Sequence, residues 1–189
     1  TKLTPRQVTE LGTAHIPEDR SKHGLVGSYT VADNLVLNRY HQAPFSRRGV
    51  RNPAAVAAEA EELIEAFDVR TPGVDVPVDN LSGGNKQKVI VARELTGNVK
   101  AIFVAQPTRG LDVGSIEFIH NQIIALRDQG AGVLLVSAEL DEILSLSDRI
   151  GVLYRGRLVG TFDAEETSRE QLGYLMATGS TPETEEVAS

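Results

Sequence analysis

One short segment of the chain combines residue types and spacing that suit the binding of a phosphate. It is the run Leu81 to Lys88, LSGGNKQK, in which a serine and two glycines precede a stretch of helix-forming residues. A serine at a helix start accepts hydrogen bonds from the first turn, and glycines let an anion approach the free N–H groups there. The positive end of the helix dipole adds to this attraction. The segment therefore predicts an anion-binding helix start.

The complementary half of a nucleotide site is missing from the sequence. No G-x-x-x-x-G-K-[ST] motif occurs in the 189 residues. The chain thus lacks the loop that cradles the α- and β-phosphates of a nucleotide and the Ser or Thr that holds Mg²⁺. We therefore expect that the chain does not act on a nucleotide alone.

The pattern of apolar and polar residues predicts two kinds of structure around this segment. The first 80 residues are mainly helical, and in the remainder helices alternate with short apolar strands, which is typical of a covered parallel sheet. An Arg155-Gly156 turn predicts a hairpin between the last two strands. The expected helices are 4–11, 31–39, 52–67, 85–96, 115–128, 139–146 and 168–177, and the expected strands are 13–16, 101–105, 133–137, 150–154 and 158–162.

Composition limits the classes of protein to which the chain can belong. With 41% apolar and 24% charged residues, it has the composition of a soluble globular domain. No apolar run approaches the roughly 18 residues needed to span a bilayer, so any membrane link is expected to pass through a partner. The net charge of −7 argues against nucleic-acid binding, and we interpret the basic cluster Arg47, Arg48 and Arg51 as a solvated loop. The absence of cysteine excludes disulfides and thiolate metal sites.

Several motifs occur together in one order along the chain. They are IPEDR from Ile16, LSGGNKQKVIVARELTGN from Leu81, AIFVAQ from Ala101, PTRGLDVG from Pro107 and VSAELDEILSLSDRIGVLYRGRLVG from Val136. This combination resembles the nucleotide-binding domain of ATP-binding cassette (ABC) transporters over nearly the whole chain. IPEDR, NKQK and PTRGLDVG look like the second cassette of the fused tandem ATPases that serve simple-sugar and nucleoside importers.

The resemblance implies an α/β fold, a partial RecA-like P-loop NTPase core with a mainly parallel sheet and a helical signature subdomain. Residues 1–17 match the start of the core, 18–97 the Q-loop and helical subdomain, and 98–179 the RecA-like core. The tail 180–189 is acidic and lacks aromatic residues, so we expect it to be disordered. The family's P-loop lies just upstream of the segment that matches Thr1, which makes a truncated chain the expectation and a natural protein without a P-loop the alternative.

The signature motif carries the main functional residues that the resemblance implies. In the family, the surface that matches Ser82, Gly83 and Gly84, with Asn85 and Gln87, contacts the γ-phosphate of ATP held by the P-loop of the opposite cassette. An ordinary glycine-rich helix cap is the alternative.

Two further positions match residues that communicate between subunits. Glu18 occupies the place of the Q-loop glutamine, in a segment that senses nucleotide and faces the membrane subunit. Asp112 matches the D-loop residue that crosses to the other cassette, and its local sequence equally predicts a helix N-cap.

The catalytic positions of the family are replaced in this chain. Ala105 stands where an active cassette has the Asp that supports Mg²⁺, and Gln106 where it has the Glu that polarises the attacking water. Ala138 stands where the family carries a His that contacts the γ-phosphate. Alanine has no side-chain oxygen and glutamine has no basic carboxylate, so we expect a half-site that is nearly silent in hydrolysis.

These residues predict the ATP-binding subunit of an importer for simple sugars or nucleosides. ATP and Mg²⁺ would serve the full transporter, with neither bound stably by this chain. The expected partners are a second ABC cassette, fused upstream, and transmembrane permease subunits; nucleic acid is not expected. The expected location is cytoplasmic, peripheral on the inner face of the plasma membrane. The loss of the P-loop elements predicts exposed apolar sheet and self-association. A soluble ABC-type ATPase of translation or DNA maintenance and a non-hydrolytic regulatory module are the alternatives.

Overall fold

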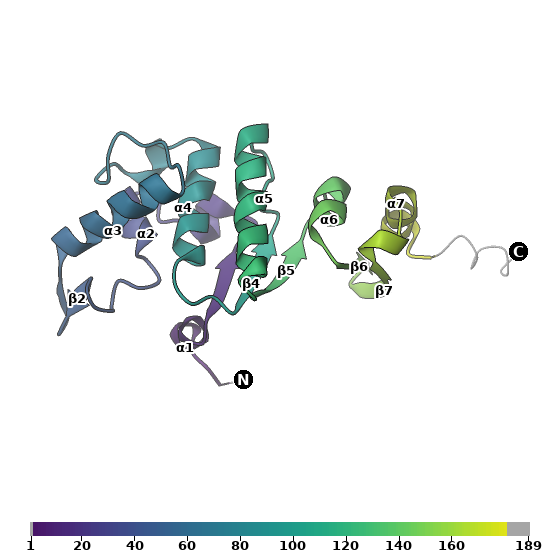
Figure 1. The fold of residues 1–189 in the computed structure, drawn as a ribbon, viewed down its shortest axis with the longest axis horizontal. Helices are drawn as coiled ribbons and strands as arrows, with labels where there is room; N and C mark the ends of the chain where they lie inside the picture. Colours follow the sequence, from purple (N-terminus) through teal and green to yellow (C-terminus); the bar gives the residue numbers. More distant parts are fainter. Residues whose placement is uncertain (1, 181–189) are drawn as a thin grey trace, which may run out of the picture. The chain divides into compact units, whose positions relative to one another are not determined.

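The computed structural model describes residues 2–180, which form two compact units (Figure 1). The first unit runs to Leu134 and the second begins at Leu135. The boundaries predicted after residues 17 and 97 both lie within the first unit and stay predictions. Of the predicted disordered tail, only Ser180 is among the described residues, and residues 181–189 lie outside them.

The first unit contains most of the helices and all strands of the parallel sheet. Its helices are α1 (Pro5–Glu10), α2 (Val31–Leu35), α3 (Pro53–Ala66), α4 (Gly83–Leu95) and α5 (Val113–Asp128), with a π-helical turn at Arg20–Gly24 and a 3₁₀ turn at Val78–Asn80. Its strands are β1 (Thr13–Ile16), β2 (Ser46–Arg47), β3 (Val50–Arg51), β4 (Ala101–Ala105) and β5 (Gly132–Val136), the last of which continues into the second unit.

The sheet of the first unit has the strand order β1-β4-β5. β1 and β4 run parallel, with Thr13 opposite Ala101 and Ile16 opposite Val104. Side chains alternate between the faces of a strand, so Ile102 and Val104 share the covered face. Figure 1 shows α4 and α5 side by side across the sheet, and α4 packs against both β1 and α5. This arrangement confirms the predicted α/β class.

A small helical group precedes the sheet strand β4 and is built from α2, α3 and α4, which pack against one another. Its core consists of aliphatic side chains from all three helices, namely Val31, Leu35, Val56, Ala60, Leu63 and Ile90. Apolar residues three or four positions apart on α3 lie on one stripe, as the sequence predicted. The group holds α4 so that its N-terminus is presented away from this core.

Six helices begin directly after a residue whose side chain caps the helix. In six helices a side-chain oxygen accepts the backbone N–H three residues ahead, at Thr4, Thr30, Asn52, Ser82, Asp112 and Ser168. Such caps satisfy one of the backbone donors that a helix start leaves unpaired. Because a cap needs only residues three positions apart, the sequence is sufficient to place it.

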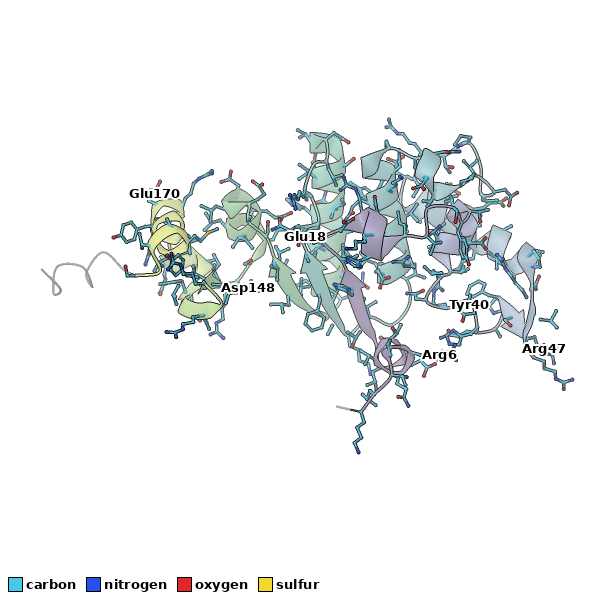
Figure 2. All side chains as sticks on the ribbon, turned by 180° about the vertical axis from the view of Figure 1, so that it is seen from behind. Arg6, Glu18, Tyr40, Arg47, Asp148 and Glu170 are labelled. Carbon is cyan, nitrogen blue, oxygen red and sulfur yellow. The ribbon has the colours of Figure 1, made fainter. Side chains whose placement is uncertain are left out.

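Three local predictions for the first half of the chain were wrong. The helix expected at 31–39 ends at Leu35, because Leu37 and Arg39 donate their N–H groups to carbonyls three residues back, not four. No helix or strand was expected between residues 18 and 30, but this segment contains the π-helical turn, which is capped by the Asp19 carboxylate. The basic cluster, interpreted as a loop, forms the β2–β3 hairpin, whose Arg47 side chain extends into solvent (Figure 2).

The second unit is a hairpin covered by helices. It contains α6 (Leu140–Leu146), β6 (Arg149–Tyr154), β7 (Arg157–Asp163), a 3₁₀ turn at Ala164–Glu166 and α7 (Arg169–Thr178). β6 and β7 pair antiparallel, which confirms the predicted hairpin, and they form a two-stranded sheet of their own. Arg155 and Gly156 turn the chain with φ angles of 47° and 79°. A cluster of Ile150, Val152, Leu172 and Leu175 is its core.

Apolar side chains are exposed on the strands of the first unit. Phe103 of β4 is 48% exposed and Leu134 of β5 is 54% exposed. Phe103 lies between Ile102 and Val104, so it points away from the face that they share. Within residues 2–180, no helix is both long and apolar enough to cross a membrane.

Candidate functional site

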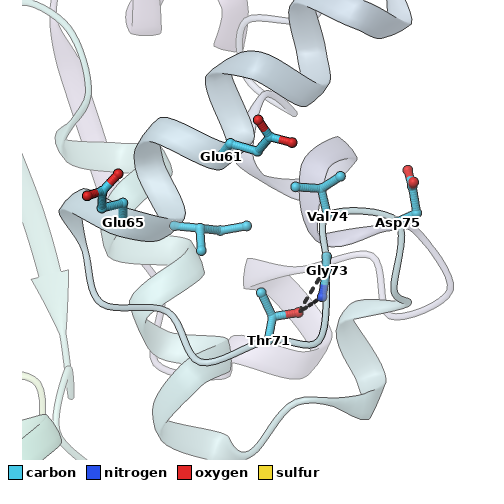
Figure 3. Close-up of a pocket in the computed structure, with 7 residues that line it drawn as sticks. Glu61, Glu65, Thr71, Gly73, Val74 and Asp75 are labelled. Atoms are coloured by element: carbon cyan, nitrogen blue, oxygen red, sulfur yellow. Dashed lines mark hydrogen bonds between the residues drawn. The ribbon is translucent and has the colours of Figure 1, made fainter.

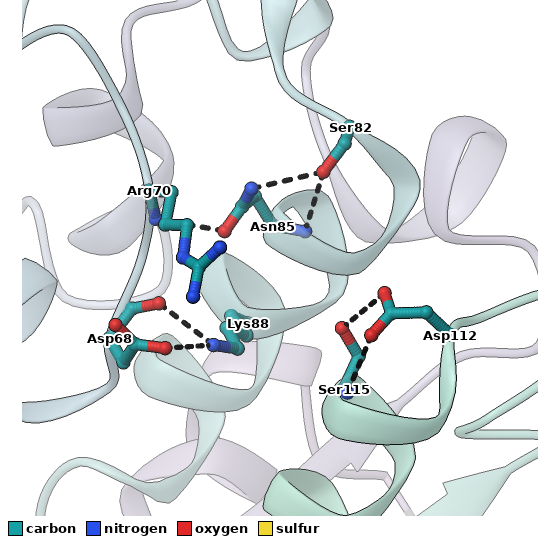
Figure 4. A network of polar contacts seen from close by, with 7 residues as sticks. All are labelled: Asp68, Arg70, Ser82, Asn85, Lys88, Asp112 and Ser115. Carbon is teal, nitrogen blue, oxygen red and sulfur yellow. Dashed lines mark hydrogen bonds and ion pairs between the residues drawn. The ribbon is translucent and has the colours of Figure 1, made fainter.

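The start of α4 forms the centre of the site (Figure 4). Ser82 is exposed and caps the helix, since its Oγ accepts the N–H of Asn85 at 3.4 Å. The cap leaves the N–H groups of Gly83 and Gly84 without acceptors inside the helix. Two amide donors, a hydroxyl and the positive end of the 13-residue helix α4 therefore gather at one place, where Ser82 is exposed, Gly83 is half-buried and Gly84 is buried. This geometry suits an anion such as a terminal phosphate.

Side chains on the next turns of α4 anchor it to the loop after α3 (Figure 4). The Asn85 amide donates to Ser82 Oγ at 3.0 Å, and its Oδ1 accepts the backbone N–H of Arg70 at 2.8 Å. Lys88 Nζ bonds the Asp68 carboxylate at 2.6 Å and the Asp68 carbonyl at 2.9 Å. The hydrogen bond from Lys88 holds the pKa of Asp68 below its usual value of 3.8. Asn85 thus orients the helix start, and its contact with a phosphate stays a prediction.

Gln87 lies one turn further along α4 than Ser82. Its side chain is 2% exposed, whereas Ser82 lies at the surface. The role of Gln87 as a phosphate contact stays a prediction.

Gly84 brings the start of α4 against the start of α5. A Cβ atom placed on Gly84 would lie 2.5 Å from Ser115 Oγ and 3.2 Å from an Asp112 carboxylate oxygen. Such distances are too short for a side chain, so this close packing requires glycine. The approach places the signature helix and the predicted D-loop residue side by side.

Asp112 caps α5, which confirms one of its two predicted roles. Its Oδ1 accepts the N–H of Ser115 at 3.0 Å, and its Oδ2 accepts the Ser115 hydroxyl at 2.8 Å. The hydroxyl hydrogen bond is the largest cause of a lowered pKa for Asp112, followed by the backbone bond. Hydrogen bonds to the charged form favour ionisation, so Asp112 carries its negative charge at neutral pH. Its role in crossing to another cassette stays a prediction.

The residues at the end of β4 leave the expected catalytic position without a carboxylate. β4 ends at Ala105, and Gln106 follows with a φ of 48°, a left-handed conformation uncommon outside glycine. Ala138 lies in the bend between β5 and α6. Among residues 2–180, no group of three His, Cys, Asp or Glu side chains is placed to hold a metal ion. Ala105 and Gln106 therefore do not fit Mg²⁺.

Glu18 lies on the segment that follows β1, as expected for the Q-loop position (Figure 2). Its carboxylate pairs with the Arg109 guanidinium at 2.9 Å, across 91 residues of chain. Two residues later, Arg20 Nη1 donates to the Arg109 carbonyl at 3.0 Å. The segment after β1 is therefore tied to the turn that leads into Asp112. Sequence analysis missed Arg20 and Arg109, although both lie within the IPEDR and PTRGLDVG motifs.

A separate pocket lies between α3 and the loop that follows it (Figure 3). It has a volume of about 440 Å³ and is lined by Glu61, Ile64, Glu65, Thr71, Gly73, Val74 and Asp75. Its carboxylates would repel a phosphate, and none of the residues of the α4 start lines it. The pocket is therefore not a candidate for the nucleotide contact.

Solved structures with the same fold are ATP-binding cassettes. A dimeric cassette in a post-hydrolysis state bound to ADP and Pi matches with a TM-score of 0.68 and 22% identity, over 86% of this chain and 68% of that chain. A nucleotide-free cassette from an ABC transporter matches with a TM-score of 0.69 and 21% identity, over 100% of this chain and 73% of that chain. The chain therefore has the ATP-binding cassette fold, with the mixed RecA-like architecture that the sequence predicted.

Curated sequence relatives define the class more narrowly. The guanosine import ATP-binding protein NupO of Bacillus subtilis is 49% identical over 179 residues, which are 95% of this chain and 35% of NupO. The nucleoside import ATP-binding protein NupA of Lactococcus lactis is 48% identical over 179 residues, 95% of this chain and 35% of NupA. The ribose import ATP-binding protein RbsA 2 of Rubrobacter xylanophilus is 40% identical over 172 residues, 89% of this chain and 32% of that protein.

The chain spans about a third of the length of these relatives. No protein-family model matches it. Fold and sequence together place the chain among the ABC nucleotide-binding domains, and its relatives are import ATP-binding proteins for nucleosides and sugars. The predicted resemblance is thereby confirmed at the level of the nucleotide-binding domain.

Proposed function

We propose that the chain is part of a degenerate second cassette in an ABC importer for nucleosides or simple sugars, and that it supplies Ser82, Gly83 and Gly84 in trans to ATP held by another cassette. The names of the relatives support the importer class, and two of them, at 49% and 48% identity, are named for the import of guanosine and nucleosides. The single observation that carries the trans role is the start of α4, where the exposed Ser82 caps a helix that opens with two glycines.

The mechanism assigned to this chain is electrostatic. In the transition state of ATP hydrolysis, negative charge is spread over the three equatorial oxygens of the γ-phosphoryl group and must be stabilised. The amides of Gly83 and Gly84 donate to its oxygens, and the Ser82 hydroxyl adds a third donor. An exposed helix dipole contributes about 0.3–1 kcal/mol to such a contact, and an interface that excludes water strengthens it. ATP hydrolysis would then close and reopen the cassette pair.

The proposal also assigns partners and a location. The P-loop and the residues that hold Mg²⁺ come from the opposite cassette, and transmembrane permease subunits couple the cassette pair to transport. The importer would carry the chain at the inner face of the plasma membrane. The chain's own half-site, with Ala105, Gln106 and Ala138, contributes little hydrolysis.

The decisive test replaces Ser82 by Arg in the intact import ATPase, reconstituted with its permease subunits in liposomes. The bulky side chain blocks the helix start, so we expect ATP hydrolysis and solute uptake to fall by about 10²–10³-fold, the loss seen when a transition-state donor is removed. Both rates are measured on the same vesicles.

The matched control is Ser168→Arg, which removes an exposed serine cap of the same kind from α7. Hydrolysis and uptake should remain at the level of the unmodified importer. If Ser82→Arg also leaves both rates unchanged, the trans role is wrong, and a regulatory module without nucleotide function becomes the better account. If the ATPase instead depends on added nucleic acid or ribosomes, the importer assignment fails.

A further inference from the structure

Arg20 links three elements of the first unit at the start of α4. Its Nη1 donates to the Arg109 carbonyl at 3.0 Å, in the turn that leads to Asp112. A Cβ atom placed on Gly83 would lie 3.1 Å from Arg20 Nη2, and one placed on Gly110 would lie 3.8 Å from it. The guanidinium therefore lies against the first residue of the signature helix, where no side chain separates the two.

The guanidinium retains hydrogen-bonding capacity at this position. Within the described part of the chain, Arg20 donates one hydrogen bond and pairs with no carboxylate. A guanidinium has five N–H donors in a planar fork that suits phosphate oxygens. Arg20 is half-buried, which reduces the screening of its charge by water. Its unused donors thus lie beside the half-buried Gly83 at the helix start.

Three other cations around the helix start are engaged in ion pairs. The pairs are Lys86–Asp79 at 3.0 Å, Lys88–Asp68 at 2.6 Å and Arg109–Glu18 at 2.9 Å. Asp112 adds a negative charge close to Gly84, which the charge of Lys88 offsets in part. A phosphate at Gly83 and Gly84 would be repelled by this carboxylate, and the positive charge of Arg20 beside Gly83 offsets it. The site needs this positive charge because the helix dipole alone is weak.

We propose that Arg20 is a phosphate-binding residue of the signature surface, which supplies the positive charge that lets the start of α4 hold the γ-phosphate of ATP bound to another cassette. This inference rests on the proposed function, because it assumes that Ser82, Gly83 and Gly84 meet such a phosphate. The ligand chemistry is a terminal phosphate with two or more anionic oxygens.

The test compares Arg20→Gln and Arg20→Lys in the intact importer, with ATP as the varied substrate. Arg20→Gln keeps a donor for the Arg109 carbonyl but removes the charge, so we expect the KM for ATP to rise about tenfold, as for the loss of one charge-assisted hydrogen bond. Arg20→Lys keeps the charge, so its KM should stay within about threefold of the original. The kcat should change less than the KM in both variants.

The dependence of the KM for ATP on salt concentration separates a role of the Arg20 charge from a purely structural role of this side chain. If Arg20 acts by charge, the KM for ATP rises less steeply with ionic strength in Arg20→Gln than in the unmodified protein. Arg127→Gln, at the far end of α5, makes the same change in net charge and should alter neither the KM nor its salt dependence. Circular dichroism melting of each variant shows whether the fold is retained.

Three outcomes overturn the inference. A KM in Arg20→Gln within about twofold of the original, while Ser82→Arg abolishes hydrolysis, rejects Arg20 and leaves the proposed function intact. Equal losses in Arg20→Lys and Arg20→Gln, with unchanged salt dependence, show that Arg20 only ties the loops together. Full activity in Ser82→Arg rejects the proposed function itself, and the inference with it.

Discussion

Ala105 and Gln106 determine what the end of β4 can do chemically. A general base is worth about 10²–10⁴-fold in rate, and neither side chain can serve as one at neutral pH. The backbone of Gln106 also has a left-handed conformation, so a carboxylate placed at this position by substitution would leave the backbone in an uncommon orientation. Chemistry at this half-site therefore depends on more than one missing group.

Restoring both acidic residues tests this dependence. In the intact import ATPase, the double substitution Ala105→Asp and Gln106→Glu should raise hydrolysis only modestly. Ala138 still stands where the family carries the His that contacts the γ-phosphate. The measurement is steady-state phosphate release. Ala105→Asn with Gln106 unchanged is the size-matched control and should have no effect. A doubling of the rate, as expected for two working sites, would show that the missing His at position 138 does not limit hydrolysis.

Local sequence was sufficient for some site residues and insufficient for others. Ser82 and Asp112 could be predicted because a helix cap depends on a donor three residues ahead. The burial of Gln87 could not be predicted, since its motif position does not reveal which side of α4 packs inward. The contacts of Arg20 and Glu18 with Arg109 join positions 89 and 91 residues apart, and no local pattern signals them.

At the level of elements, one buried side chain fixes the segment between β1 and α2. Asn34 is fully buried, and its Oδ1 accepts the Val26 N–H at 2.9 Å. Its amide donates to the carbonyls of Val26, Tyr29 and Thr30 at 3.1, 3.3 and 3.0 Å. This polar anchor holds the loop that continues the Q-loop segment. The start of α2 was predictable from Thr30, but no local pattern signals this role for Asn34.

Asn34→Ala should destabilise the first unit by about 2–4 kcal/mol, since buried backbone groups of Val26 lose their partners. Urea unfolding followed by circular dichroism measures the change, because the chain has no tryptophan. Asn38→Ala is the matched control. The Asn38 Oδ1 is buried and has no hydrogen-bond partner among residues 2–180, so its loss should cost less than about 1 kcal/mol. Equal effects of the two substitutions would contradict the anchoring role.

For the whole molecule, the exposed strand residues bear on the predicted self-association. Phe103 and Leu134 are large apolar side chains at 48% and 54% exposure, on neighbouring strands of one sheet. Exposed apolar strands lower their free energy by burying surface against another molecule. The sequence predicted the sheet and its exposure, but the particular residues depend on which face α4 and α5 cover.

The 189-residue chain should therefore associate as its concentration rises, with a mass above its 20.4 kDa in sedimentation experiments. Phe103→Gln combined with Leu134→Gln should shift the association to higher concentration. The control pair Leu153→Gln and Leu158→Gln removes similarly exposed leucines from the hairpin of the second unit. A monomeric chain at all concentrations, or an effect of the control pair alone, would contradict this assignment.

The glycine contact between α4 and α5 has a mechanical consequence. No side chain separates Gly84 from Ser115, so the start of α4 cannot move toward α5 without a clash. The first turn of α4 and the cap of α5 are therefore in direct contact. We therefore expect a change at the first turn of α4 to reach Asp112 directly, since the two lie well within a Debye length of each other and no salt screens them.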